Sequence, residues 1–520
     1  MPKWLENAVF YEIYPQSFYD TNGDGIGDFE GIIQKLDYIR ELGCNALWIN
    51  PCFDSPFSDA GYDVRDYKKT AARYGSNDDL ARLFREAHKR DIRVLLDLVP
   101  GHTSEEHPWF RASQKPEDNE YTNRYIWTDH WFMKPEGLGY VAGEGERGVY
   151  VINFFKCQPA LNYGFLKPGK PWQLPMDHPD CVATREAMKE VMRFWLDAGC
   201  DGFRVDMAFS LVKNDDERKS GTSAVWRNIR EMLDRDYPQA ALVAEWGSPE
   251  LSIPAGFHAD FLLSGDDQAP AYRSLLREYK TDRNYTIRED KSFFKGTGDI
   301  RVFLDGYLSH YEAVKKGGYI ALISCNHDTI RPAFNLSPRE LALYYGFLFT
   351  MPGAPFLYYG DEIGMRYLNL PTKEGGYFRT GSRTPMQWKA GKNLGFSDAE
   401  APALYLPVDG AAGAPTVEAQ LKDKDSLLNT IKALLKLRHK EDELQSKANL
   451  EIVYAEKDKY PFVYKRGPFV IAVNPHKKAA AAPVPGTFPA AGSPVFAIGD
   501  GSLSGGTCAM AEKSFMVWKV

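Results

Sequence analysis

Short apolar runs alternate with amphipathic segments along most of the chain, and this alternation restricts the possible folds more than any other feature. The runs 44–51 (CNALWINP) and 92–100 (IRVLLDLVP) are separated by a helical pattern at 77–91. The alternation recurs about eight times between residues 8 and 364. Nearly continuous apolar strands are typical of a parallel sheet that is covered on both faces. We therefore predict an α/β fold, a closed (β/α)8 TIM barrel.

Two stretches interrupt the alternation. Residues 103–177 are rich in Trp, Tyr, Pro and Gly and have no strong helical pattern, so we expect an inserted subdomain after the third strand. Residues 446–520 contain short β-like runs, which are typical of an antiparallel β domain. The predicted units are a barrel at 1–102 and 178–445, the inserted subdomain at 103–177, and a C-terminal β-sandwich domain at 446–520.

The charge and the cysteine pattern exclude several classes of partner. The formal net charge is −7 and the chain has no basic tract, which argues against nucleic acid and anionic membranes. No apolar run approaches the roughly 20 residues that a membrane span needs. The N-terminus lacks a signal-peptide pattern, and seven scattered cysteines indicate reduced thiols. We expect a cytoplasmic protein, although one whose signal peptide had been removed would read the same way. The oligomeric state is not predicted.

Three acidic residues follow predicted strands at comparable positions: Asp206, Glu245 and Asp328. Active sites of such barrels form at the C-terminal ends of the strands. Cleavage of a glycosidic bond needs an acid that protonates the leaving oxygen and a carboxylate on the opposite face of the sugar. Arg204 shares a strand face with Asp206 and would keep it ionised, whereas the apolar neighbours of Glu245 suit an acid. The alternative is a set of structural ion pairs that close the barrel mouth.

Seven short motifs occur in order along the chain. DLVPGH (97–102), GFRVD (202–206), the Glu245 strand and NHD (326–328) resemble the four central regions of the alpha-amylase family of retaining glycoside hydrolases. The resemblance covers nearly the whole chain. The flanking motifs of the family are matched by SPFSDAGYDVRDY (55–67), QPALN (158–162) and GAPFLYYGDEIG (353–364).

The resemblance implies a role for each of eight residues. Asp206 would be the nucleophile, Glu245 the acid/base and Asp328 the stabiliser of the transition state. The remaining residues would bind the sugar, with the first two closing its non-reducing end: Asp59, Tyr62, His102, Arg204 and His327.

The segment 20–31 (DTNGDGIGDFEG) places oxygen donors at alternate positions of a glycine-rich loop. Such ligands suit Ca²⁺, and the loop resembles the early metal loop of the oligo-1,6-glucosidase, α-glucosidase and trehalose synthase group. It is not a full EF-hand because Gly31 stands where the closing Glu would be, and the alternative is an Asx/Gly turn without an ion. We predict a structural Ca²⁺ and no organic cofactor. The predicted ligands are Asp20, Asn22, Asp24, Ile26 and Asp28.

SRTPMQW (382–388) also resembles this group, and from the same loop Arg379 or Arg383 could reach the barrel mouth. Gly101 stands where the family usually has Asn, and Ala160 where the oligo-1,6-glucosidase group usually has Asp. Met207 follows the predicted nucleophile, where smaller or β-branched residues help to set the linkage preference in the family, so the linkage preference is not predicted. We expect an exo-acting, retaining α-glucosidase that hydrolyses short α-glucosides, of the maltose or isomalto-oligosaccharide type, by double displacement. The alternatives are a transglycosylase or isomerase such as trehalose synthase, and a non-catalytic relative that serves in carbohydrate binding or in interaction with a partner.

Overall fold

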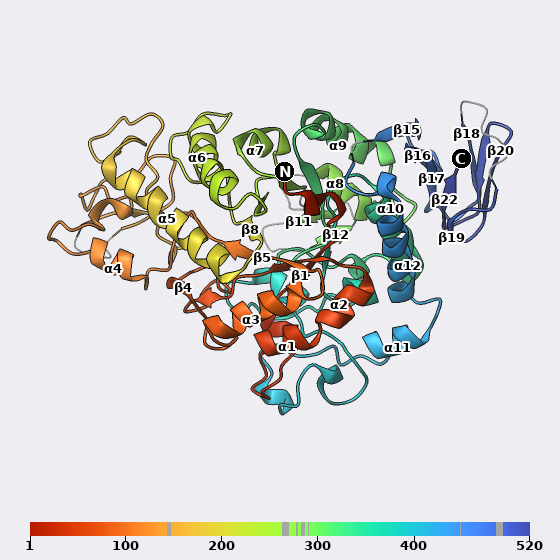
Figure 1. The fold of residues 1–520 in the computed structure, drawn as a ribbon, viewed down its shortest axis with the longest axis horizontal. Helices are drawn as coiled ribbons and strands as arrows, with labels where there is room; N and C mark the ends of the chain where they lie inside the picture. The colour runs from red at the N-terminus through yellow and green to blue at the C-terminus, as the bar shows by residue number, and fades with distance from the viewer. Residues whose placement is uncertain are drawn as a thin grey trace.

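The computed structural model describes residues 1–142, 147–262, 270–276, 279–281, 287–289, 291–447, 449–484 and 492–520 (Figure 1). Eight parallel strands form its central sheet: β1 (Phe10–Ile13), β2 (Ala46–Ile49), β5 (Arg93–Leu98), β8 (Gly202–Val205), β9 (Ala241–Ala244), β10 (Ala259–Leu262), β13 (Tyr319–Leu322) and β14 (Phe356–Tyr358). Their order is β13-β10-β9-β8-β5-β2-β1-β14. A parallel bridge between Ile323 and Phe356 joins the two edge strands, β13 and β14. The predicted (β/α)8 barrel is therefore confirmed.

The sequence patterns identified all of these strands except β10. This strand is four residues long and carries Asp260 at its second position, which interrupts the apolar run. The Asp260 carboxylate accepts hydrogen bonds from the backbone N–H groups of Trp246 and Gly247, at 3.0 and 3.1 Å. It thereby holds the turn that directly follows Glu245. An apolar side chain in place of Asp260 would leave these two N–H donors unpaired.

Helices cover the outside of the barrel: α1 (Phe29–Gln34), α2 (Leu36–Leu42), α3 (Asn77–His88), α5 (Pro179–Ala198), α6 (Ser220–Asp236), α7 (Pro249–Ala255), α8 (Pro270–Leu276), α9 (Ile300–Val314), α10 (Pro338–Thr350), α11 (Val417–Lys422) and α12 (Leu427–Lys440). The helix predicted at 31–43 divides at Lys35 and ends at Gly43, which adopts the left-handed conformation with φ 105°. Ser76 and Asp79 form a capping box at the start of α3. None of the helices in the described residues is both long and apolar enough to cross a membrane.

The chain between β5 and α5 contains little regular structure, as expected for an insertion. It includes α4 (Pro108–Ser113) and the paired strands β6 (Tyr140–Val141) and β7 (Tyr150–Val151). Phe110 packs against Tyr125, Trp127 and Tyr150 with ring centroids 5.0 to 5.6 Å apart. These rings explain the aromatic composition of the segment, whereas its predicted boundaries stay a prediction.

The C-terminal strands form two antiparallel sheets. One contains β15 (Leu450–Tyr454), β16 (Phe462–Arg466), β17 (Phe469–Asn474), β22 (Ser514–Lys519) and β19 (Phe496–Ile498), and the other β18 (Ala480–Pro483), β21 (Thr507–Met510) and β20 (Gly501–Ser504). Strand β17 is buried at every position because its alternate residues face two cores. Ile471 and Val473 join the barrel core, whereas Val470 and Ala472 pack with the smaller sheet. The predicted antiparallel β region is therefore confirmed.

Candidate active site

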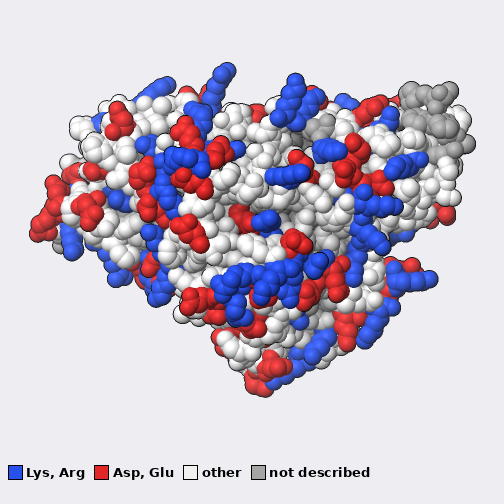
Figure 2. All heavy atoms as spheres, viewed as in Figure 1, with Lys and Arg blue, Asp and Glu red and all other residues white. Residues whose placement is uncertain are grey.

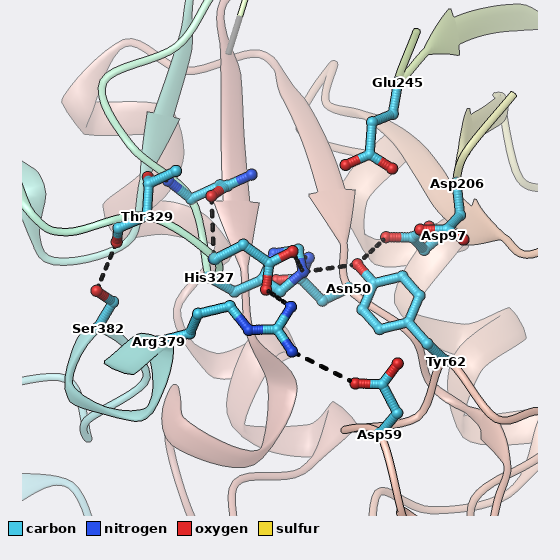
Figure 3. Close-up of polar contacts among 12 residues, drawn as sticks. Asn50, Asp59, Tyr62, Asp97, Asp206, Glu245, His327, Thr329, Arg379 and Ser382 are labelled. Carbon is cyan, nitrogen blue, oxygen red and sulfur yellow. Dashed lines mark hydrogen bonds and ion pairs between the residues drawn. The ribbon is translucent and has the colours of Figure 1, made fainter. Parts of the chain in front are cut away.

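A cavity of about 190 Å³ opens at the C-terminal ends of the barrel strands. All of the predicted catalytic and substrate-binding residues line it except Arg204 and His327, and these two contact residues that do. The structure therefore brings all eight together. Figure 3 labels Asp59, Tyr62, Asp206, Glu245 and His327 among them. The cavity is lined by Asp59, Tyr62, His102, Phe154, Asp206, Met207, Phe209, Glu245, Asp328 and Arg379.

Arg204, which is only 1% exposed, contacts three carboxylates at the base of this cavity. Its Nη1 lies 2.8 Å from Asp97 Oδ1 and 3.3 Å from Asp206 Oδ1. Its Nη2 lies 2.8 Å from Glu245 Oε2. Strands β8 and β9 are paired in parallel with Val205 opposite Ala244, so Asp206 and Glu245 leave neighbouring strands at the same level. Figure 3 shows both side chains directed into the same space.

The pKa of Asp206 is higher than the sequence alone suggested. We expected Arg204 to keep Asp206 ionised, but this guanidinium is shared with Glu245 and Asp97. Burial and the neighbouring Glu245 carboxylate raise the pKa of Asp206 well above its usual range, against the opposing effect of Arg204. The repulsion between the two carboxylates disfavours the state in which both are ionised. One acid and one anion are the charge states that a retaining glycosidase needs.

Asp97 holds two of the predicted site residues in place, although it was not itself among the predicted site residues. It is 1% exposed, and its Oδ2 accepts hydrogen bonds from Trp48 Nε1 and the Tyr62 hydroxyl, both at 3.0 Å. Its Oδ1 pairs with Arg204. Asp97 therefore fixes both Arg204 and Tyr62 beneath the cavity. The signal available in the sequence was its place at the end of a strand that begins the DLVPGH motif.

Met207 follows Asp206 in a backbone conformation that non-glycine residues rarely adopt, with φ 40°. Its backbone N–H donates to Glu245 Oε2 at 3.0 Å. The strained residue thus contacts the Glu245 carboxylate directly, and strained backbone is common at active sites. Phe154 and Phe209, which the sequence did not single out, line the same cavity.

His327 carries a positive charge below the cavity. Its Nε2 lies 2.7 Å from the Tyr62 hydroxyl and 3.3 Å from Asp328 Oδ2, and its Nδ1 lies 2.9 Å from Glu12 Oε1. Burial opposes the charge, but Asp328 and Glu12 outweigh it and raise the pKa of His327 to about 9. Protonated His327 therefore donates from both ring nitrogens and holds Tyr62 and Asp328 in place.

Asp328 is held as an anion by two arginines from the loop after β14. Burial would raise its pKa, but Arg379, His327 and Arg383 together hold the pKa of Asp328 well below its usual range. Arg379 Nη1 and Arg383 Nη2 donate to Asp328 Oδ1 at 2.9 and 2.8 Å. The other side of Arg379 approaches Asp59, with Nη2 3.7 Å from Oδ1. Both arginines reach the barrel mouth, as the sequence predicted.

The protein-family comparison decides the family of this chain. Residues 12–447 match the family described as alpha amylase, catalytic domain. The chain belongs to the alpha-amylase family.

Relatives in this family carry several named activities. The chain is 33% identical over 477 residues to the trehalose synthase/amylase TreS of Mycolicibacterium smegmatis, and the aligned region covers 84% of this chain and 77% of that protein. It is 31% identical over 503 residues to an oligo-1,6-glucosidase of Parageobacillus thermoglucosidasius, which covers 84% of both. The fold is similar to a mutant isomaltulose synthase from Erwinia rhapontici NX5 in complex with D-glucose, with a TM-score of 0.83 and 24% identity over 100% of this chain and 99% of that chain. The chain is a glycoside hydrolase of the alpha-amylase family.

Gly101, which departs from the family pattern, makes room for Asn153. A Cβ atom at Gly101 would lie 2.6 Å from Asn153 Nδ2. That amide donates to His102 Nδ1 at 3.2 Å, and Lys213 Nζ donates to Asn153 Oδ1 at 3.0 Å. Burial lowers the pKa of His102 to about 3, so the ring is neutral and its Nε2–H donates to the Tyr62 carbonyl at 3.1 Å. Both ring nitrogens of this predicted sugar ligand are therefore engaged within the protein.

The loop predicted to bind Ca²⁺ is closed by its own hydrogen bonds. Asp20 Oδ1 accepts from the backbone of Asn22, Asn22 Oδ1 from that of Asp24, and Asp24 Oδ1 from that of Ile26. Asp28 caps the start of α1. No group of three or more His, Cys, Asp or Glu side chains in the described part of the chain is placed to hold a metal ion. These contacts match the Asx/Gly turn alternative, and calcium binding stays a prediction on which no catalytic step depends.

Proposed function

We propose that this protein is a retaining α-glucosidase that removes the terminal glucose of short α-glucosides. The observation that carries the proposal is the pairing of Asp206 and Glu245, which leave neighbouring strands, share the Arg204 guanidinium and line one cavity. Two carboxylates that face one sugar, with one proton between them, supply the acid and the nucleophile of double displacement.

The reaction divides into two steps. In the first, ionised Asp206 attacks the anomeric carbon while protonated Glu245 gives its proton to the departing glycosidic oxygen, which leaves a covalent glucosyl-Asp206 ester. In the second, Glu245 takes a proton from water, and the resulting hydroxide oxygen displaces Asp206 from the anomeric carbon. Anionic Asp328 accepts hydrogen bonds from sugar hydroxyls and stabilises the positive charge that develops on the ring.

Action at chain ends follows from the way the cavity is closed. Arg379 extends from Asp328 toward Asp59. Gln158 Nε2 fixes Asp59 from behind by donating to its Oδ2 at 2.8 Å. The cavity volume of 190 Å³ is below the roughly 300 Å³ at which pockets for drug-sized ligands begin, so we expect it to enclose a single sugar ring.

Incubation of the purified protein with a panel of glucose disaccharides tests the proposal. Maltose, isomaltose and trehalose would each be supplied, and the products followed by NMR during the first turnovers. We expect glucose released from at least one α-linked substrate, first as the α-anomer because two displacements retain configuration. Initial release of the β-anomer would contradict the double displacement, and inertness toward every substrate would contradict the function.

Isomerisation is the second candidate. It is favoured by relatives that are named trehalose synthase and by the small cavity, in which a released sugar could stay and attack the glucosyl-Asp206 ester in place of water. Trehalose formed from maltose without an equivalent release of glucose would establish this candidate over hydrolysis. The same carboxylates would catalyse both reactions, so the ratio of trehalose to glucose distinguishes them.

A further inference from the structure

A second and larger cavity lies on the outside of the barrel. It is a groove of about 430 Å³ between β4 (Asp66–Thr70), α4, the 3-10 helix η3 (Thr122–Arg124) and α5. None of the residues that line it lines the catalytic cavity. Figure 1 shows α4 and α5 at the end of the molecule opposite the C-terminal strands. No role in the proposed reaction uses this groove.

Two aromatic rings with parallel planes line the groove. The rings of Trp109 and Tyr121 are stacked with an interplanar angle of 14° and centroids 6.5 Å apart. His107 packs against Trp109 with centroids 4.5 Å apart, and Tyr67 lies 6.1 Å from the same ring. Trp109 is thereby fixed in one orientation while part of its surface remains open to the groove. Rigid, partly exposed rings offer apolar contact at little cost in conformational entropy.

A largely buried arginine, Arg124, lies against both rings. The guanidinium carbon of Arg124 is 4.9 Å from the Trp109 centroid and 5.6 Å from that of Tyr121. Arg124 is 7% exposed and lines the groove. Within the described residues its side chain makes no hydrogen bond or ion pair, and burial lowers its pKa. None of its nitrogens is among the fully buried atoms that lack a hydrogen-bond partner, so these donors keep some exposure. Guanidinium N–H groups that line a groove without a protein acceptor can donate to a ligand that supplies oxygen atoms.

The remaining side chains determine the charge of that ligand. Burial lowers the pKa of His107 to about 3, so this histidine is neutral. Acidic and basic side chains are also mixed over the visible surface of this end of the molecule (Figure 2). The basic residues of the groove, Arg65, Lys68 and Arg124, are matched by the acidic residues Asp66, Glu120 and Glu190.

We propose that this groove is a second carbohydrate-binding site, which takes a neutral α-glucan oligosaccharide. The aromatic rings contact the apolar face of a sugar, Arg124 donates to its hydroxyl or ring oxygens, and Glu120 and Glu190 accept from its hydroxyls. An anion would meet the three carboxylates, whereas a neutral polyol satisfies donors and acceptors together. The choice of an α-glucan rests on the proposed function, but the groove itself does not.

The groove is connected to the catalytic cavity through Tyr67. Its hydroxyl lies 2.8 Å from the carbonyl oxygen of Val99 and 2.7 Å from that of His102, whose ring lines the catalytic cavity. One hydrogen bond, from Tyr67 to the backbone of His102, therefore links a residue of the groove to a residue of the catalytic cavity.

Titration calorimetry with maltotriose tests the proposal on the Asp206→Asn protein, which cannot turn the sugar over. We expect two classes of site, one of which weakens at least tenfold in Trp109→Ala and in Arg124→Leu. Trp131→Ala is the matched control, because Trp131 is 48% exposed in the same insertion but does not line the groove. Turnover of a small chromogenic α-glucoside by the otherwise unmodified Trp109→Ala enzyme should stay within twofold of the parent.

A single class of site, or two classes unchanged in both groove variants, would overturn the proposal. If Trp109→Ala does not fold, Arg124→Leu decides alone, since it removes a guanidinium that makes no hydrogen bond or ion pair within the described residues. Tighter binding of glucose 6-phosphate than of maltotriose to the groove would overturn the assignment to a neutral ligand. Failure of the proposed function is a separate result, because it would show as absent turnover while groove binding persisted.

Discussion

Arg379 joins Asp328 to Asp59 across the catalytic cavity. Its Nη1 lies 2.9 Å from Asp328 and its Nη2 3.7 Å from Asp59, so one guanidinium approaches two carboxylates from different loops (Figure 3). In the proposed function, this contact would limit how far a glucan chain can extend beyond the sugar at the reaction centre.

Arg379→Met should therefore open the closed end of the cavity. We expect kcat/KM for maltose to fall about 100-fold, because Asp328 loses a charged hydrogen bond and the terminal sugar loses the side chain that closes its end of the cavity. The share of products cut from inside longer maltodextrins should rise. Chromatography of the products measures this share, with Arg301→Met, a substitution on the exposed face of α9, as the control. An unchanged product pattern would contradict the role of Arg379 as the stop.

Asp206→Asn should abolish turnover and leave the fold intact. Loss of the nucleophile should lower kcat by about 10⁴-fold or more. The thermal midpoint should be unchanged or higher, because a neutral amide removes the repulsion from Glu245 that raises the pKa of Asp206. Steady-state kinetics and thermal unfolding check both expectations. Residual activity near one-tenth of the parent would show that another group is the nucleophile.

Glu362 should make the protein less stable as the pH rises. Its Oε1 accepts from the Tyr11 and Tyr38 hydroxyls at 2.7 Å, and burial raises its pKa to about 7. The folded state thus binds a proton that the unfolded state releases between about pH 4.5 and 7, so the free energy of unfolding falls across this window.

Glu362→Gln should remove this dependence, because the amide can accept the same bonds without ionising. Relative to the parent, the variant should gain about 3 kcal/mol between pH 4.5 and 8, from the pKa shift at this fully buried site. Thermal midpoints measured across that range test the expectation. Parallel curves for the two proteins would refute it.

Gly101→Asn should lower both activity and stability, although it restores the usual family residue. Its Cβ would collide with the Asn153 amide, and the loss of that amide would free His102 Nδ1. We expect kcat/KM to fall about tenfold or more, as for other buried networks near a site. A double-mutant cycle with Asn153→Ala, in which the combined loss is smaller than the sum of the two single losses, would establish that the two positions are coupled.

Much of the fold could be predicted because it repeats a single physical pattern. Apolar strands followed by amphipathic helices specify a barrel, and polar residues at the strand ends must then meet at one mouth. Asp206, Glu245 and Asp328 were therefore accessible to sequence reasoning. Strand β10 was not, since Asp260 breaks its apolar run and acts through the backbone of another loop.

The contacts between the side chains were harder to predict. The two-residue spacing placed Arg204 beside Asp206, but the spacing along one strand does not show that the adjacent strand brings Glu245 closer still. The use of both His102 nitrogens depends on Asn153, which lies 51 residues away in the insertion. Such pairings are fixed by how separate loops fold against each other, and no local pattern records them.

Strand β17 presents one set of side chains to the barrel and the alternate set to the smaller sheet. The C-terminal region, about the last 75 residues, is thus part of the barrel core and cannot be removed without exposing apolar surface. A chain that stopped after α12 would expose the apolar surface that Ile471 and Val473 cover. We expect its main defect to be self-association through this surface, and not slower catalysis.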